Sequence, residues 1–293
     1  MPMLLSCADP LNPRRTDPHF AAETAKARQL GAGVGLIDHD LLAAGDAVAA
    51  VRSIPRDSGP AWYRGWMIPS PAYSALSEAL AARGTQLLTD TAAYRSAHEL
   101  PGWYPNFAPV TATTRWLPSP PGRVPDRATL AASAAPLGAG PGIVKDYVKS
   151  AKHAWDTACY IPDLTDIDRL HRVVAAFVAE QGDYLSGGIV LRAFESFTVG
   201  DRRPAEARVW WLDGEPLLVG PHPDTPDECP EPVLDRVAAC VAHSDARFLT
   251  TDLALRADGA WRVVEVGDGQ VSDLPAGIDP TPILAALLDA PAR

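Results

Sequence analysis

The sequence predicts an α/β fold in which the second half of the chain is of the α+β kind, and three features of the pattern support this. In the N-terminal part, short apolar runs alternate with helical periods, an order that builds a parallel sheet covered by helices. The later part contains two pairs of strand-like runs joined by Asp-Gly, which is typical of antiparallel hairpins. A stretch rich in proline, glycine and alanine separates the two parts. We therefore expect an N-terminal Rossmann-like domain followed by a domain of another type.

Composition limits the function classes that fit. The 293 residues are 47% hydrophobic and 21% charged, which is ordinary for a folded globular protein, and the net charge is −10. A wide nucleic-acid or anionic-membrane surface needs a basic field, so we expect neither partner. The N-terminus lacks a signal-peptide pattern, no apolar run is long enough to span a membrane, and the four cysteines form no C-x-x-C pair. These features predict a cytoplasmic protein with reduced thiols.

The N-terminal domain is expected to cover residues 1–105. Its predicted order is strand, turn-rich segment, helix, strand, strand, helix and strand, at residues 3–7, 9–15, 17–30, 33–38, 61–68, 70–83 and 85–88. The glycines near residue 33 follow a helix and precede a strand, the reverse of a dinucleotide-binding loop, so we expect no such cofactor. Arg14, Arg15 and Arg64 are candidates for binding an anionic substrate. Each is equally explained by a structural contact, such as Arg64 with an acid like Asp40.

Residues 106–141 are expected to be a linker and domain entry, and a lysine-rich strand follows them. The chain contains only four lysines, and three of them lie within residues 142–152. Because side chains alternate along a strand, Lys145 and Lys149 should share one face, whereas Lys152 lies beyond the strand. A lysine ammonium suits a phosphate oxygen, although a charged run can also be a solvated edge.

The elements that follow combine helices with several strands. Apolar residues at helical spacing predict a helix from about Thr165 to Gly182. A later strand contains Arg192, and an Asp-Gly hairpin after it contains Arg208. The strand, the hairpin and a further helix are predicted at residues 187–197, 206–219 and 233–243.

The second Asp-Gly pair, Asp258 and Gly259, predicts a two-residue type I′ turn, from which the register can be counted. With that turn, Asp252 lies opposite Glu265. Side chains directly opposite one another have Cβ atoms about 4.5–5.5 Å apart, where like charges are destabilising. A divalent cation would remove the repulsion, and Mg²⁺ is commonly held by one or two carboxylates and by substrate phosphates. Salt bridges to arginines, or a solvated face, are the alternative explanation.

Together these features predict a site for a nucleoside triphosphate. Lysines and arginines bind phosphates, and the two carboxylates bind the metal ion that bridges them. The chain has no G-x-x-x-x-G-K-[ST] loop and no protein-kinase motif set, so it is neither a P-loop enzyme nor a protein kinase.

In this order the motifs resemble the ATP-grasp superfamily, and in particular the clade named for two arginines and a lysine. The resemblance covers most of the chain. It implies that a two-lobed ATP-grasp domain follows the N-terminal domain, at residues 142–293, with a nucleotide-clamping lobe at 142–197, a metal and catalytic lobe at 198–293, and ATP between two sheets. The motifs are Tyr-Arg-Gly-Trp-Met at 63–67, Val-Lys-Asp-Tyr-Val-Lys-Ser at 144–150, Leu-Arg-Ala-Phe-Glu at 191–195, Glu-Ala-Arg-Val at 206–209, and Asp252 with Val-Glu-Val at 264–266.

The resemblance assigns the nucleotide to residues of three strands. Lys145 would contact the α- and β-phosphates, with Lys149 nearby, and Arg208 would reach the γ-phosphate. Lys145 and Arg208 are the residues expected to be catalytic. The hinge strand would run along the adenine and supply backbone hydrogen bonds, and it consists of Arg192, Ala193, Phe194 and Glu195.

The same resemblance implies that Asp252 and Glu265 hold Mg²⁺. Gly267 stands where a metal-binding asparagine is usual, and Asp268 is a possible substitute. The implied reaction is phosphoryl transfer from ATP to a carboxylate, giving an acyl phosphate that an amine attacks, with release of ADP and phosphate. The substrates would be small-molecule or short-peptide carboxylates and amines. A kinase with a stable phosphorylated product and a non-catalytic nucleotide-binding regulator are the alternatives.

Overall fold

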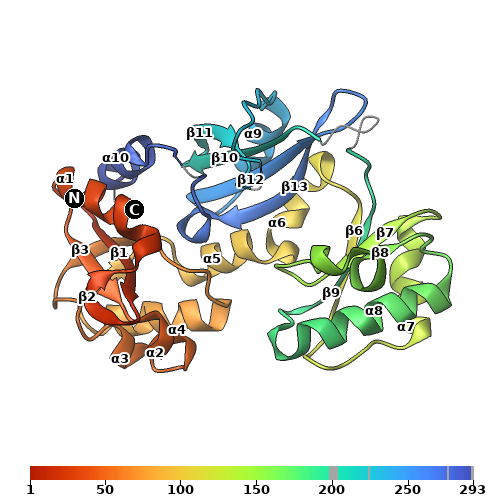
Figure 1. The fold of residues 1–293 in the computed structure, drawn as a ribbon, viewed down its shortest axis with the longest axis horizontal. Helices are drawn as coiled ribbons and strands as arrows, with labels where there is room; N and C mark the ends of the chain where they lie inside the picture. Colours follow the sequence, from red (N-terminus) through yellow and green to blue (C-terminus); the bar gives the residue numbers. More distant parts are fainter. Residues whose placement is uncertain (198–203, 224, 276, 292–293) are drawn as a thin grey trace. The chain divides into compact units, whose positions relative to one another are not determined.

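The structure is a computed structural model and describes residues 1–197, 204–223, 225–275 and 277–291 (Figure 1). These residues form two compact units, each built from separate stretches of the chain. Unit 1 contains residues 1–98, 205–253 and 265–293, and unit 2 contains residues 99–204 and 254–264.

The units do not coincide with the expected domains, because the chain returns to unit 1 after residue 204. The expected linker, residues 106–141, is itself folded and contains strand β6 (Thr114–Pro118) and helix α7 (Arg127–Ala134) of unit 2. Its proline and glycine content indicated a linker and domain entry, yet β6 forms an antiparallel pair along its whole length. The expected lobe boundary at 197/198 adjoins residues outside the described part of the chain.

A five-stranded sheet organises the N-terminal part of unit 1. β1 (Met3–Asp9) pairs in parallel with β3 (Val34–Ile37) and β4 (Gly59–Tyr63), and β4 pairs in parallel with β5 (Thr85–Leu87), which confirms the predicted parallel arrangement. The segment expected to be rich in turns is instead a short turn followed by β2 (Asn12–Thr16), antiparallel to β1. The helices of this part are α1 (Ala21–Gln29), α2 (His39–Ala43), α3 (Ala47–Ala50), α4 (Ser70–Ala81) and α5 (Thr91–His98).

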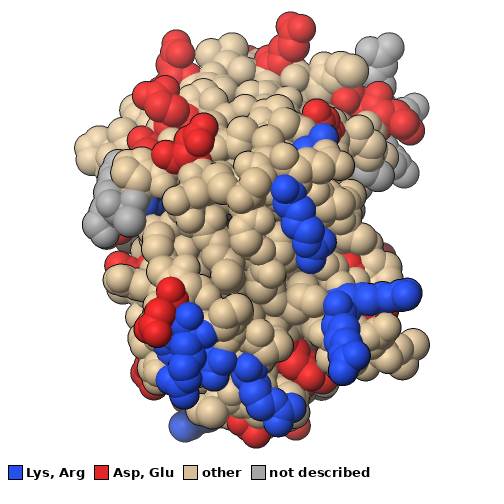
Figure 2. All heavy atoms as spheres, turned by 90° about the vertical axis from the view of Figure 1, so that its left-hand side faces the viewer, with Lys and Arg blue, Asp and Glu red and all other residues tan. Residues whose placement is uncertain are grey.

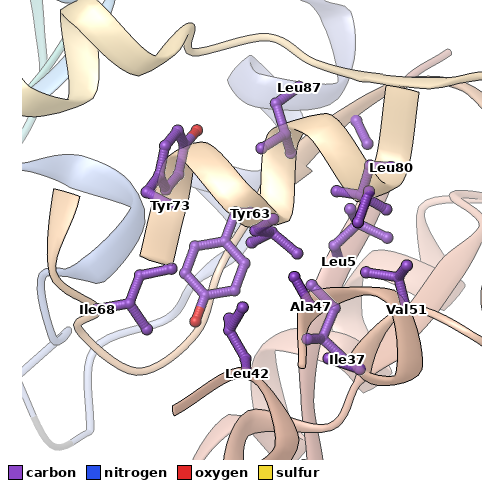
Figure 3. Packing of buried hydrophobic residues seen from close by; sticks show 14 of the residues in the cluster. Leu5, Ile37, Leu42, Ala47, Val51, Tyr63, Ile68, Tyr73, Leu80 and Leu87 are labelled. Carbon is purple, nitrogen blue, oxygen red and sulfur yellow. The ribbon is translucent and has the colours of Figure 1, made fainter. Parts of the chain in front are cut away.

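Apolar side chains from strands and helices form one continuous core in this region of unit 1 (Figure 3). Leu5, Ile37 and Tyr63 come from three neighbouring strands and meet Leu80 of α4, and all four are fully buried. The chain leaves α1 through Gly31, whose φ of 86° is a conformation that glycine adopts without steric strain. The core therefore fixes the sheet on which the rest of unit 1 is built.

A second sheet has the strand order β11-β10-β12-β13. In the first predicted hairpin, Asp213 and Gly214 have φ values of 51° and 93°, as a type I′ turn requires, and Leu212 pairs with Glu215. One short helix lies in the sequence between β11 and β12, and another follows β13. The second of these helices was not predicted. The elements are β10 (Glu206–Leu212), β11 (Glu215–Pro221), α9 (Asp235–Val241), β12 (Phe248–Leu255), β13 (Trp261–Asp268) and α10 (Thr281–Asp289).

The turn of the second hairpin differs from the prediction. Gly259 has a φ of 83°, whereas Asp258 does not have a positive φ, so the turn is not type I′. Gly259 N donates to Arg256 O at 2.9 Å, and Arg256 N donates to Ala260 O at 2.9 Å. Arg256 therefore pairs with Ala260, and the register next to the turn is displaced by one residue from the predicted one.

Unit 2 contains a four-stranded sheet with the order β6-β9-β7-β8. One face of helix α8 buries Val173, Phe177 and other apolar residues at helical spacing, in the core shared with this sheet. The cap of this helix is Asp166, one residue after the predicted start, and the helix ends at Gly182 as predicted. The bounds are α6 (Leu100–Phe107), β7 (Gly142–Lys145), β8 (Tyr160–Ile161), α8 (Ile167–Gln181) and β9 (Gly188–Ala193).

The lysine-rich strand is shorter than predicted. β7 ends at Lys145, because Asp146 Oδ1 accepts hydrogen bonds from the N–H groups of Val148 at 2.7 Å and Lys149 at 2.5 Å and turns the chain. Lys149 therefore lies in a loop and does not share a strand face with Lys145. Lys152 lies beyond the strand, as expected, and is exposed.

No helix in the described residues is both long and apolar enough to cross a membrane. All four cysteines are free. On the face drawn in Figure 2, Lys and Arg side chains stand in separate groups, some of them next to Asp or Glu, so the positive charge of this face is local.

Candidate functional site

Strands β10 and β12 bring an arginine and an aspartate together in unit 1. Arg208 Nε lies 2.7 Å from Asp252 Oδ1, and Arg208 Nη2 lies 2.8 Å from Oδ2, so the guanidinium binds the carboxylate with two parallel hydrogen bonds. Glu206 is two residues before Arg208 on β10 and so lies on the same face of the strand. Both side chains of the ion pair are 14% exposed, which withdraws the pair largely from water.

His222 joins this pair and was not identified from the sequence. It directly follows β11, and its Nε2 lies 3.3 Å from Asp252 Oδ2 while its Nδ1 lies 3.7 Å from Glu206 Oε2. The imidazole therefore stands between carboxylates from two strands. The sequence contains no signal for this, because His222 begins an irregular, proline-rich stretch in which periodicity does not predict the direction of a side chain.

The charged groups of this cluster set one another's protonation. Burial alone would raise the pKa of Asp252, but hydrogen bonds from Arg208 and His222 outweigh burial and lower that pKa to about 2. Burial opposes the charge of Arg208, yet Asp252 and other nearby acids, including Glu265, raise the pKa of its guanidinium. At neutral pH the cluster therefore holds a charged carboxylate beside a charged guanidinium.

A pocket of about 260 Å³ opens beside the ion pair, and Arg208, Asp252 and Glu265 all line it. If the pairing next to the hairpin turn continued unchanged, a one-residue displacement would place the two carboxylates on opposite faces. The pairing must therefore shift between the turn and these positions. The structure thus brings the two predicted carboxylates into one pocket, although the type I′ turn and the register counted from it were predicted wrongly.

The pocket contains carboxylate and hydroxyl oxygens, which are donors that suit Mg²⁺. A Cβ added at Gly267 would lie 3.1 Å from Thr250 Oγ1 and 3.3 Å from Ser272 Oγ, so these two hydroxyls occupy the space beside residue 267. In the described part of the chain, no group of three or more His, Cys, Asp or Glu side chains is arranged to hold a metal ion. A cation here would therefore have at most the two carboxylates of Asp252 and Glu265 as acidic ligands, with its other positions filled by phosphate oxygens and water.

Asp268 does not reach this pocket. It is fully buried, and its Oδ1 accepts from Gln270 N at 2.9 Å and from Gln270 Nε2 at 3.1 Å, while Oδ2 has no hydrogen-bond partner among the described residues. Burial is the main cause that raises the pKa of Asp268 to about 7. The expectation that Asp268 supplies a third metal ligand is therefore not supported, and its contacts are structural.

In unit 2, the two candidate lysines lie in different surroundings. Lys145 is 5% exposed at the end of β7, and its Nζ lies 3.4 Å from Val148 O. The adjacent Asp146 is also buried, and burial raises the pKa of its carboxyl despite hydrogen bonds from backbone N–H groups. Lys149 is exposed in the following loop. The structure therefore holds Lys145 in place much more firmly than Lys149.

The side chain of Arg192 is committed to contacts within unit 2. Its Nη1 donates to Val264 O at 2.6 Å, and its Nη2 donates to Val263 O at 3.0 Å and to Thr111 Oγ1 at 2.5 Å. The guanidinium is thereby directed at strand β13, so the side chain of Arg192 is not available to a nucleotide.

The rest of the expected hinge is similarly engaged. Ala193 N and Phe194 N donate to Thr113 O and Pro141 O, both at 2.9 Å. The carboxylate of Glu195 pairs with Arg262 at 2.9 Å and Arg256 at 3.4 Å. The Phe194 ring is 37% exposed, and the rings of Tyr160 and Trp155 lie 5.5 and 5.9 Å from it, between centroids. These aromatic rings form an apolar surface beside the strand end.

The three candidate arginines of the N-terminal part, Arg14, Arg15 and Arg64, do not share one environment. Arg64 is 1% exposed, its Nε and Nη2 bind the two oxygens of Glu23 at 2.8 and 2.7 Å, and its Nη1 donates to two backbone carbonyls. We therefore assign Arg64 a structural role, with Glu23 as its partner in place of the expected Asp40. Arg14 and Arg15 are exposed on β2.

Part of the chain matches a known protein family. The model of an ATP-grasp domain family, family 3 of the clade named for two arginines and a lysine, matches residues 136–287, just over half of the chain. A search of curated protein sequences finds no significant match.

Several solved structures share the fold. D-cycloserine synthetase DcsG is 14% identical, with a TM-score of 0.62 over 98% of this chain and 99% of that one. The ATP-grasp ligase PsnB, in complex with a minimal precursor, Mg and ADP, is 14% identical, with a TM-score of 0.56 over 98% and 96%. N5-carboxyaminoimidazole synthase from Aspergillus clavatus, in complex with ADP and 5-aminoimidazole ribonucleotide, is 12% identical, with a TM-score of 0.60 over 99% and 78%. At these identities the likeness shows the fold.

Proposed function

Because this chain belongs to family 3 of the two-arginine, one-lysine clade of ATP-grasp domains and is thus an ATP-grasp enzyme, we propose that it is an ATP-dependent carboxylate-amine ligase. The observation that carries the proposal is the pocket in unit 1, where an arginine and two carboxylates from three strands converge. The structures of similar fold include proteins described as a synthetase, a ligase and a synthase, which is consistent with it. Its substrates would be small-molecule or short-peptide carboxylates and amines.

The reaction we propose begins with transfer of the γ-phosphoryl group of ATP to a carboxylate oxygen of one substrate. The amine nitrogen of the second substrate then attacks the carbonyl carbon of this acyl phosphate and forms an amide, and phosphate leaves. Such transfers depend on positioning and on neutralising the phosphate charge rather than on a strong acid or base. A pocket that combines fixed positive charge with oxygen donors provides that environment.

Individual residues of the chain have distinct roles in this proposal. Arg208 binds the transferring phosphoryl group, and its contacts with Asp252 hold its guanidinium in one orientation at the pocket. Asp252 and Glu265 would hold Mg²⁺, which when bound supplies further positive charge to the phosphates. Lys145 binds phosphate in unit 2, where its burial favours a paired ammonium.

For the base of the nucleotide we propose the end of β9 and the residues after it. The Phe194 ring lies with two other aromatic rings and offers an apolar contact surface for a purine. Backbone groups of residues 192–195 other than the N–H groups of Ala193 and Phe194 would supply hydrogen bonds, whereas the side chains of Arg192 and Glu195 stabilise unit 2. Lys149 would contact phosphate from its exposed loop.

The proposal is tested by measuring ADP release across a panel of amino acids and short peptides, with mass spectrometry of the products. ADP release that needs both a carboxylate and an amine, together with an amide product, supports the ligase. ADP release with one substrate and a stable phosphorylated product would assign a kinase instead, and ATP binding without ADP across the panel would assign a non-catalytic role.

A substitution in the pocket tests the site itself. We expect Glu265→Ala to abolish ATP turnover while the protein stays folded, because one of the two carboxylates that would hold the cation is lost. Glu215→Ala is a matched control, since Glu215 is exposed at the β10–β11 turn. Unimpaired turnover in Glu265→Ala would contradict the metal assignment.

A further inference from the structure

One side chain that lines the pocket has no role in the reaction described above. His222 is 14% exposed, its Nε2 lies 3.3 Å from Asp252 Oδ2 and 3.5 Å from Arg208 Nη2, and its Nδ1 lies 3.7 Å from Glu206 Oε2. The imidazole therefore contacts both members of the central ion pair and has a second carboxylate behind it. An exposed surface histidine would not be held from two sides in this way.

The contacts of Asp252 show what this arrangement accomplishes. A carboxylate has about four lone-pair directions, two on each oxygen. Arg208 uses one direction on Oδ1 and one on Oδ2, and His222 approaches Oδ2 as well. The contacts made by the described residues therefore occupy Oδ2 more fully than Oδ1. They also fix the rotation of the Asp252 carboxylate about its Cβ–Cγ bond. Oδ1 is therefore the oxygen presented to a cation.

We propose that His222 is a positioning residue: it holds the Asp252 carboxylate in the orientation that lets Oδ1 bind a divalent cation while Arg208 stays aligned with the pocket. The proposal rests on the proposed function, because it gives Asp252 a metal to bind. Removing such a partner of a metal ligand typically costs about 10–100-fold in metal affinity or activity. Glu206 acts in the same way at a greater distance from the cation, because it orients the imidazole.

Two substitutions at His222 distinguish the contact made by Nε2 from the contact made by Nδ1. In His222→Gln the amide nitrogen lies about where Nε2 stands and can still donate to Asp252. In His222→Asn the amide nitrogen lies about where Nδ1 stands and can reach only toward Glu206. Both replacements are neutral, polar and smaller than histidine, so a purely structural role would affect them similarly.

The test measures Mn²⁺ binding by electron paramagnetic resonance in the presence of saturating ADP, and ADP binding without metal by calorimetry. We expect His222→Gln to stay within about 3-fold of the unsubstituted protein, and His222→Asn to bind Mn²⁺ about 10-fold more weakly. Metal-free ADP affinity should be the same in all three proteins. His243→Asn is the matched control, because His243 is exposed and its Nδ1 faces Ala239 O at 2.7 Å, away from the pocket.

Equal Mn²⁺ affinities for the Gln and Asn variants would overturn the proposal, and so would a loss of metal-free ADP binding in the Asn variant. If circular dichroism shows that the Asn variant does not fold, Glu206→Gln replaces it, and unchanged Mn²⁺ affinity in Glu206→Gln overturns the proposal. The absence of Mn²⁺ binding in the unsubstituted protein with ADP would instead contradict the proposed function. The two failures are therefore distinguishable.

Discussion

The buried carboxyl of Asp268 should make the stability of unit 1 depend on pH in a direction opposite to that of most aspartates. Its pKa is raised from 3.8 to about 7, chiefly by burial. In the folded protein it is therefore protonated at pH values where the unfolded chain has released the proton. Because the native state binds more protons between these pKa values, the free energy of unfolding falls as the pH rises through this range.

The magnitude follows from the size of the pKa change. Each pKa unit is worth 1.36 kcal/mol, so a rise from 3.8 to about 7 changes the free energy of unfolding by roughly 4 kcal/mol across the whole titration. About 2.5 kcal/mol of this stability is lost between pH 5 and pH 8. Asp268→Asn cannot titrate and should lack this loss. We therefore expect the stability of the variant relative to the unsubstituted protein to improve by about 2.5 kcal/mol between pH 5 and pH 8.

Urea unfolding followed by tryptophan fluorescence at several pH values provides the measurement. Comparing the two proteins at each pH cancels the contributions of all other titrating groups, and it also cancels any fixed cost of placing an amide in this site. Parallel pH profiles for the two proteins would refute the reasoning, since they would show that Asp268 has the same pKa in both states.

Three further predictions concern the rest of the chain. Asp252 has a pKa lowered to about 2, so the stability that it contributes should be present above its ordinary value of 3.8 and be lost as the pH falls toward 2; Asp252→Asn should flatten that part of an acid unfolding curve. Gly187→Ala should destabilise unit 2 by about 1–3 kcal/mol in urea unfolding, because an added Cβ would lie 2.1 Å from the Tyr147 ring and φ is 72°. Arg192→Ala should lower the stability of unit 2 by about 3 kcal/mol, because it leaves buried carbonyls without donors, and hydrogen exchange should show faster exchange in residues 254–264.

The parts of the fold that follow from local rules were predictable from the sequence. Alternating strands and helices indicated the parallel sheet, and Asp213-Gly214 fixed the first hairpin through its two positive φ values. Arg208, Asp252 and Glu265, which the sequence also singled out, all line one pocket, and their roles stay predictions. The sheet and the first hairpin needed only the order of neighbouring elements and the turn residues.

The predictions that failed depended on contacts with distant parts of the chain. The strand through Lys149 ends early because of the Asp146 turn, and that carboxylate also accepts from Ser186 N at 3.1 Å, forty residues away in sequence. The side-chain partners of Arg192 and the burial of Asp268 are likewise set by other elements, which the sequence did not indicate. Asp258-Gly259 also forms a turn of another geometry, because Asp258 does not adopt the positive φ that type I′ requires.

The interrupted course of the chain has a consequence for how the protein is made. Unit 2 includes residues 254–264, whose carbonyls accept the hydrogen bonds of Arg192, so neither unit is complete until the ribosome has passed residue 264. Synthesis proceeds at about 5–20 residues per second, so the first 98 residues wait on the order of ten seconds or more for the segments that finish their unit. During this interval the β1–β5 sheet lacks the later segments of unit 1, residues 205–253 and 265–293. Apolar surface that these segments cover in the finished protein is then open to chaperones.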